Sequence, residues 1–146
     1  MQRLKIWIGG LLALTFAYIY FHSVLLNNPT DVSSKFELMK SDSDYMLGTG
    51  GHVVFRRDLN RGSVASITRN ISADSWNSEL FSGYRAALLA RGWKVRQHTI
   101  DEKWEACKLG ALVTLDTKPE RFPALSVNTY AIRFEYSAGT ISECGP

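Results

Sequence analysis

The chain has 146 residues with a formal net charge of +3, and 17 of its residues are Lys or Arg. Arg3 and Lys5 precede all the acidic residues, and without them 15 basic residues face 14 acidic ones. Nucleic-acid binding normally needs a concentrated basic surface. This nearly balanced composition therefore argues against a nucleic-acid partner.

The first element in chain order is an uncharged apolar stretch of 21 residues, 6–26. As a helix it would extend about 31 Å, which matches a hydrocarbon core of about 30 Å. Its aromatic and aliphatic side chains surround the whole helix, whereas a core helix would carry them on one stripe. The stretch therefore predicts a single transmembrane anchor in contact with the lipid bilayer.

Charges beside this stretch predict its orientation. Arg3 and Lys5 lie just before it, and the first basic residue after it is Lys35. Because basic residues resist translocation, we expect residues 1–5 in the cytoplasm and the C-terminal domain in the periplasm or cell exterior. A cleaved signal peptide is the alternative, but it would have a shorter apolar core and a small-residue cleavage site. A lipoprotein would need a cysteine just after the stretch, and the first is Cys107.

Residues 27–51 are rich in Ser, Asp, Asn and Gly, which predicts a polar linker. Within it, residues 31–40 could form either a short helix or a loosely ordered stalk. Asp42 and Asp44 are expected to be solvated. The folded extracytoplasmic domain is predicted over residues 52–146.

This domain opens with the pattern of a β-hairpin. Residues 53–55 favour a strand, 58–62 a turn, and 64–71 alternate as a second strand. A helix is predicted over 74–91, because apolar side chains recur every four residues from Trp76 to Leu88. Ser72 or Asp74 could cap its start, and Gly92 suits its end.

Alternating apolar residues predict strands over 93–98 and 128–136, and the mostly apolar segment 111–115 predicts another between them. Pro119 and Pro123 bracket a loop between the last two of these. The resulting order is β-β-α-β-β-β. We therefore expect an α+β fold in which one helix packs on a small antiparallel sheet.

The two cysteines, Cys107 and Cys144, both fall in the part expected to be exported. Oxidising compartments favour disulfides, so we expect these residues to pair. Such a bridge would stabilise the fold by about 3–4 kcal/mol. The alternative is two free thiols.

Sequence signatures of an enzyme are scarce. His22, His52 and His98 share no metal-ligand spacing with one another or with the cysteines, and no nucleophile or phosphate-binding motif occurs. We therefore assign no catalytic residue, metal or cofactor.

A candidate interaction surface comprises the basic cluster Arg56, Arg57 and Arg61 together with Trp104. Arginines bind acidic protein faces, anionic headgroups or polyanionic polymers, and exposed tryptophan is a frequent interface anchor. The alternative is a solvated hairpin balanced by Asp58, with Trp104 in the core.

Two classes of function fit these observations. The favoured one is a non-catalytic, membrane-anchored protein-binding module, such as an accessory subunit of an envelope complex or an immunity-type inhibitor of an envelope-acting toxin. The other is an envelope enzyme with a site on the sheet face. That hypothesis requires polar residues such as His98, Glu105, Arg133 and Glu135 to converge in one pocket.

Overall fold

The computed structural model describes residues 14–19, 29–96, 103–124 and 126–145. The chain divides into two units, Met1–Thr30 and Asp31–Pro146. In the first unit residues 14–19 are helical, and the rest of the predicted anchor over 6–26 lies outside the described residues. In the described part of the chain, no helix is both long and apolar enough to cross a membrane.

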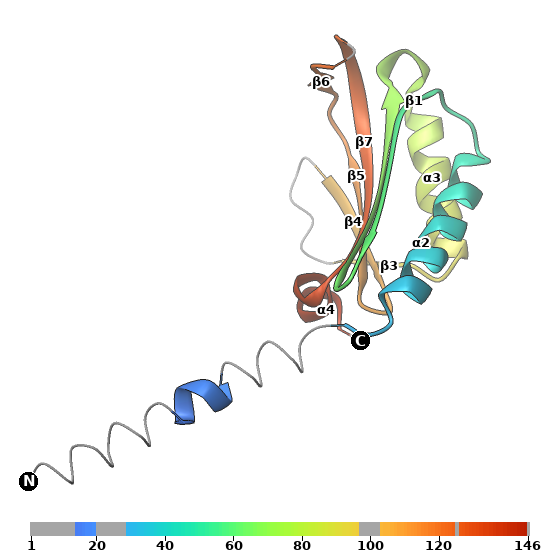
Figure 1. Ribbon diagram of the computed structural model, residues 1–146. Helices are drawn as coiled ribbons and strands as arrows, with labels where there is room; N and C mark the ends of the chain where they lie inside the picture. The colour runs from blue at the N-terminus through green and yellow to red at the C-terminus, as the bar shows by residue number, and fades with distance from the viewer. Residues whose placement is uncertain (1–13, 20–28, 97–102, 125, 146) are drawn as a thin grey trace, which may run out of the picture. The chain divides into compact units, whose positions relative to one another are not determined.

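The second unit has an α+β fold, in which helices pack on a mostly antiparallel sheet of seven strands (Figure 1). Its strands are β1 Val53–Arg61, β2 Val64–Ser72, β3 Lys94–Val95, β4 Lys103–Lys108, β5 Ala111–Asp116, β6 Glu120–Phe122 and β7 Val127–Tyr136. Its helices are α2 Val32–Leu47, the short 3-10 helix η1 Ala73–Ser75, α3 Ser78–Ala90 and α4 Ala138–Cys144.

The strands follow the order β1-β2-β7-β5-β4-β3 across the sheet, and β6 pairs with the start of β7. The predicted hairpin is present as β1 and β2, but β1 continues to Arg61 through the expected turn. The chain reverses instead at Gly62, whose φ of 52° suits a residue without a Cβ. The sheet is larger than expected, because β4 and β6 were not predicted as separate strands.

Helices α2 and α3 both cover one face of the sheet (Figure 1). Strand side chains alternate between the two faces, so every second residue of the central strands lies beneath these helices. These positions are largely apolar, and they form the buried core: Ala65, Ile67, Ile71, Ala106, Val113, Leu115, Ile132, Phe134 and Tyr136.

Helix α2 lies within the segment predicted as a polar linker. The short-helix alternative for residues 31–40 agrees with its first part, but the helix continues to Leu47, where only linker was expected. Its buried stripe contains Val32, Met39 and Met46, which recur every seven residues. Ser43 and Asp42 are also buried, between the two methionines. These polar residues concealed the apolar periodicity, and only packing against the sheet makes it evident.

Helix α3 confirms the predicted amphipathic helix but starts later. Asn77 is its N-cap and accepts a hydrogen bond from the Leu80 N–H at 2.8 Å, whereas residues 73–75 form η1. Leu80, Tyr84 and Leu88 form its buried stripe as expected. The chain leaves the helix at Gly92, which has a positive φ of 87°.

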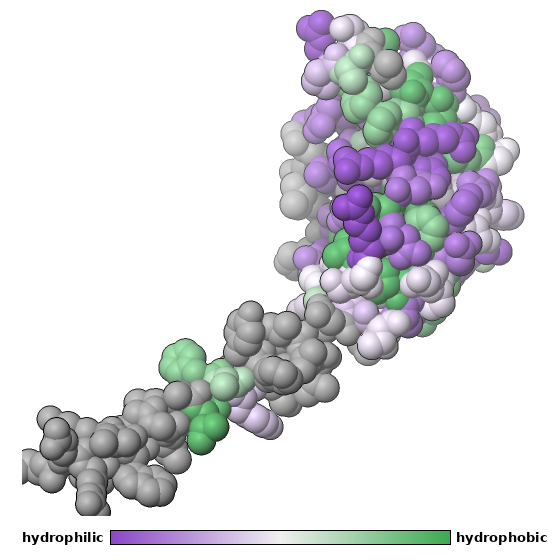
Figure 2. Space-filling model, in the orientation of Figure 1, coloured by the Kyte–Doolittle hydropathy of each residue, from purple (hydrophilic) through white to green (hydrophobic). Residues whose placement is uncertain are grey.

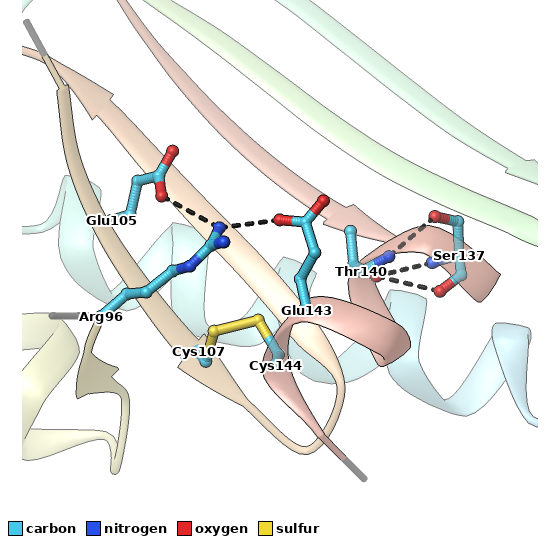
Figure 3. Close-up of a disulfide and its surroundings, with 7 residues drawn as sticks. All are labelled: Arg96, Glu105, Cys107, Ser137, Thr140, Glu143 and Cys144. Atoms are coloured by element: carbon cyan, nitrogen blue, oxygen red, sulfur yellow. Dashed lines mark hydrogen bonds and ion pairs between the residues drawn. A yellow bond between two sulfur atoms is a disulfide. The ribbon is translucent and has the colours of Figure 1, made fainter. Parts of the chain in front are cut away.

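The predicted disulfide between Cys107 and Cys144 is present and joins β4 to α4 across 37 residues (Figure 3). Helix α4 follows directly from β7 and begins with a capping box, in which Ser137 and Thr140 exchange side-chain and backbone hydrogen bonds. In Figure 1 this helix lies at one end of the sheet, on the side away from α2 and α3.

Candidate binding site on the open face of the sheet

The face of the sheet opposite α2 and α3, here called the open face, carries mainly polar and charged side chains. Strand register aligns one row of them across five strands. The row consists of Arg57, Thr68, Arg133, Thr114 and Glu105. Figure 2 shows hydrophilic side chains over the middle of this unit, where β1 and β2 run in Figure 1.

A cavity of about 270 Å³ lies on this face, at the end where β6 pairs with β7. Strands β1, β2, β5 and β7 supply its floor and sides, and β6 supplies a further wall. The ring of Phe122 on β6 lies 4.9 Å from the ring of Phe55 on β1, measured between centroids. This contact between strands at opposite sides of the cavity shows that the sheet curls around it.

Asp116, the last residue of β5, is a buried acid in the cavity wall, and only 2% of it is exposed. Its Oδ2 accepts a hydrogen bond from the Ala131 N–H at 3.1 Å, and its Oδ1 lies 3.4 Å from Nη1 of Arg133. Burial raises the pKa of the Asp116 carboxyl above its ordinary value, and the Arg133 guanidinium opposes that rise. Both carboxylate oxygens of Asp116 thus contact groups within the protein, and the contact with Nη1 positions the Arg133 side chain.

The cavity floor contains a second internal pair. Asn70 Nδ2 donates to Thr129 Oγ1 at 3.0 Å, and both residues are buried. Because buried polar groups are costly when unpaired, this bond allows β2 and β7 to carry amide and hydroxyl groups here. The floor is therefore polar and held in place before any ligand arrives.

Three arginines, Arg57, Arg121 and Arg133, line the cavity; together with it they are called the arginine trough. Arg57 and Arg121 are exposed, and their guanidinium groups form no ion pair with any residue that the structure describes. Arg133 keeps 34% of its side chain exposed. Arginine presents five N–H donors that match carboxylates and phosphates. This arrangement is suited to binding an anionic group.

The other end of the open face is organised around the disulfide (Figure 3). Arg96 Nη1 lies 3.2 Å from Glu105 Oε2 and 2.7 Å from Glu143 Oε2, so one guanidinium bridges β4 and α4. A second hollow, of about 530 Å³, lies beside Cys107 and Cys144 at the β3 edge. Here two carboxylates neutralise Arg96, and α4 covers part of the face.

The predicted interaction residues do not form one surface. Arg56 and Arg57 are consecutive in β1, so they lie on opposite faces of the sheet. Arg61 ends the strand beside the hairpin turn and lies outside the trough. Asp58 pairs with the buried Arg69 rather than with any of these arginines.

Trp104 also lies away from the surface expected for it. Only 6% of it is exposed, and it belongs to the core, where the Arg85 guanidinium lies 5.7 Å from its ring centroid. It lies on the side of β4 that α2 and α3 cover, because it pairs with the buried Leu115. The core alternative for this residue is therefore correct.

The residues required by the enzyme hypothesis do not share one pocket. Arg133 lines the trough, whereas Glu105 pairs with Arg96 and Glu135 is exposed outside the cavity lining. His98 lies outside the described residues. Within the described ranges, no group of three or more His, Cys, Asp or Glu residues could hold a metal ion.

Comparison of the chain with protein-family models, curated proteins and solved structures found no match. The site is therefore interpreted from its own residues. Sequence reasoning named Arg57 and Arg133 for different reasons and did not bring them together. It missed Asp116 and β6, although an acid that directly follows the apolar strand 111–115 was a usable indication of a buried carboxylate.

Proposed function

We propose that this protein is a membrane-anchored, extracytoplasmic binding module that captures a protein partner on the open face of its sheet, without catalysis. The observation that carries this proposal is the asymmetry of the sheet. One face is covered by two helices, and the other presents polar and charged side chains around a cavity. An accessory subunit of an envelope complex would have this design.

The dimensions of the sheet suit a protein partner. Six strands of between 2 and 10 residues lie side by side, and at about 4.8 Å per strand and 3.3 Å per residue they cover roughly 650 Å². A standard protein interface takes about 800 Å² from each partner. The open face is therefore of the right order for one such contact.

The proposed location rests on two features. The Cys107–Cys144 disulfide is typical of an oxidising, extracytoplasmic compartment. The uncharged stretch 6–26, preceded by Arg3 and Lys5, would supply the anchor and export the domain. An anchored domain meets its partners in the layer next to the membrane.

A co-purification experiment with a matched pair of variants tests the proposal. The full-length chain is extracted gently from its source cells, and proteins that copurify at a stoichiometric ratio are quantified. Glu135→Trp adds a bulky ring to the open face, whereas Glu37→Trp makes the same change on the exposed side of α2. We expect Glu135→Trp to remove the partner and Glu37→Trp to retain it. Equal retention by both variants would contradict binding at the open face.

A further inference from the structure

We infer that the partner contributes an acidic, extended peptide segment, and that the arginine trough binds its carboxylates. This inference rests on the proposed function and specifies the chemistry of the partner at that same face. It concerns mainly Arg57 and Arg133, which register places on the open face. Arg121 lines the cavity from β6, where it pairs with Asn128, and its neighbour Glu120 pairs with Thr129 of the floor.

The charge balance of the trough favours an anionic ligand. Against its three arginines stand Asp116 and Glu120. Asp116 is buried and already bound to the Ala131 N–H and to Arg133, so it offers little to a cation from outside. Glu120 is exposed on the β6 wall. Among the lining residues, the accessible guanidinium groups of Arg57 and Arg133 are therefore opposed by one exposed carboxylate, that of Glu120.

The available hydrogen-bond donors also favour carboxylates. Arg133 uses Nη1 toward Asp116 and has no other side-chain hydrogen bond to a described residue. Asp116 restrains this guanidinium while most of its N–H donors stay available. The side chain of Arg57 is exposed and donates no hydrogen bond to a described residue. Planar guanidinium groups bind carboxylates through two parallel hydrogen bonds, so each arginine can hold one carboxylate.

The spacing of the arginines suits an extended chain. Arg57 pairs with Thr68, and Thr68 pairs with Arg133, so the two arginines lie two strands apart. That separation is about 10 Å, and carboxylates on alternate residues of an extended peptide lie about 7 Å apart on one side. The long arginine side chains can span this difference. Thr68 lies between them in the trough and offers a hydroxyl group to the peptide.

A membrane surface is a weaker explanation for these arginines. Anionic headgroups attract basic side chains that point to one side of a protein, whereas consecutive Arg56 and Arg57 point to opposite faces of β1. The trough is also a hollow with a curled wall, which a flat bilayer would enter poorly. A narrow acidic chain fits that shape better.

Peptide binding to the full-length protein in neutral detergent tests the inference. The probe is a fluorescent nine-residue peptide of alternating Glu and Ser, and the control peptide has Gln in place of every Glu. We expect the acidic peptide to raise the fluorescence anisotropy, and the neutral one to leave it unchanged. Arg57→Gln and Arg133→Gln should each weaken binding about tenfold, as expected when a charged hydrogen-bonding group is lost.

Arg61→Gln is the matched control, because it removes the same charge from β1 outside the trough. We expect it to weaken binding less than about twofold, as for an exposed charge. Arg133→Lys keeps the positive charge but loses the planar guanidinium that can make two parallel hydrogen bonds. Its affinity for the acidic peptide should therefore lie between those of the wild type and Arg133→Gln. Thermal unfolding of each variant separates lost binding from lost folding.

Three outcomes would overturn the inference: equal binding of both peptides, an equal loss in Arg61→Gln and Arg57→Gln, or binding only to phosphatidylglycerol vesicles. The last result would assign these arginines to lipid headgroups. If the acidic peptide fails while Glu135→Trp still removes the copurifying partner, only the acidic chemistry is wrong. If Glu135→Trp retains the partner, the proposed function itself fails.

Discussion

A carboxylate is buried on each face of the sheet, and the two differ in the number and length of the hydrogen bonds that they accept. Asp42 on the covered face is fully buried and accepts from three donors: Arg91 Nε at 2.6 Å, Trp93 Nε1 at 2.9 Å and Lys108 Nζ at 2.7 Å. Asp116 on the open face has two longer contacts, at 3.1 Å and 3.4 Å. Charged, short hydrogen bonds are the strong ones.

This difference separates stability from recognition. Asp42 connects α2 to the end of α3 and to β4, so it locks the helical layer onto the sheet. Asp116 holds a guanidinium whose remaining donors stay accessible. We therefore expect changes on the covered face to act mainly on the free energy of unfolding, and changes on the open face to act mainly on binding.

The largest effect is expected from Asp42→Ala. Removing this carboxylate leaves Lys108, Arg91 and Trp93 with donors that lack an acceptor, which should lower the free energy of unfolding by about 3–5 kcal/mol. Asp44, two residues on, is exposed, and its carboxylate pairs with Lys40, whose side chain is 41% exposed. Asp44→Ala should therefore cost less than about 1 kcal/mol. Urea unfolding measures both losses. Equal losses would show that the buried Asp42 contributes no more to stability than the exposed Asp44.

The disulfide should give a similar or slightly smaller effect. Cys107 and Cys144 are separated by 37 residues, and closing a loop of that size contributes about 4 kcal/mol through the unfolded state. The double replacement by serine should lose this amount in urea unfolding. Reductant should destabilise the wild type to the same level and leave the double variant unchanged. A reductant effect on the double variant would point to another cause.

The buried hydroxyl of Tyr84 makes the stability of the covered face depend on pH. Burial raises the pKa of its hydroxyl to about 12. The unfolded chain ionises first, near pH 10, so the stabilisation is complete below pH 10 and is lost as the pH rises towards about 12. The loss should be on the order of 2–3 kcal/mol.

Replacing one tyrosine at a time identifies the source of this loss. Tyr84→Phe should reduce the slope of the stability curve between about pH 10 and 12 without removing it, because the pKa of Tyr136 is also raised to about 12. Tyr45→Phe, at an exposed position of α2, should leave the slope unchanged. Urea unfolding across this range provides the comparison. An unchanged slope in Tyr84→Phe would show that other groups dominate the alkaline loss.

The smallest effect is expected from Asp116→Asn. Because burial raises the pKa of Asp116, the protonated form favours folding, and stability falls as the pH rises from the unfolded value of 3.8 through the raised folded value. Asn is uncharged, so the variant should lose this dependence. At neutral pH its free energy of unfolding should be lower than that of the wild type by at most about 1 kcal/mol. A larger loss of stability would mean that Asp116, like Asp42, mainly stabilises the fold.

The sequence was informative where periodicity was local. The alternation in 64–71 and 128–136, the four-residue repeat of α3 and the role of Gly92 all predicted the observed elements, because each depends on neighbours within a few residues. The disulfide was predictable because two cysteines allow one internal pairing. The α+β class followed from these elements.

The polar contacts were beyond such reasoning. Asp42 was expected to be solvated, and its burial depends on Trp93 and Lys108, which lie 51 and 66 residues further along the chain. The second half of helix α2 was missed for the same reason, since Asp42 and Ser43 are buried between Met39 and Met46. A polar residue is buried only where distant segments bring it partners, and local sequence does not record those partners.

The sequence by itself therefore determined the period of α3, β2 and β7, the α+β class and the cysteine pair. The tertiary structure alone decided which acids are buried, which arginines share a cavity, and that Trp104 belongs to the core. The physical reason is that backbone conformation and apolar patterning act over a few residues. Burial of charge instead depends on donors and acceptors that meet only when the sheet is assembled.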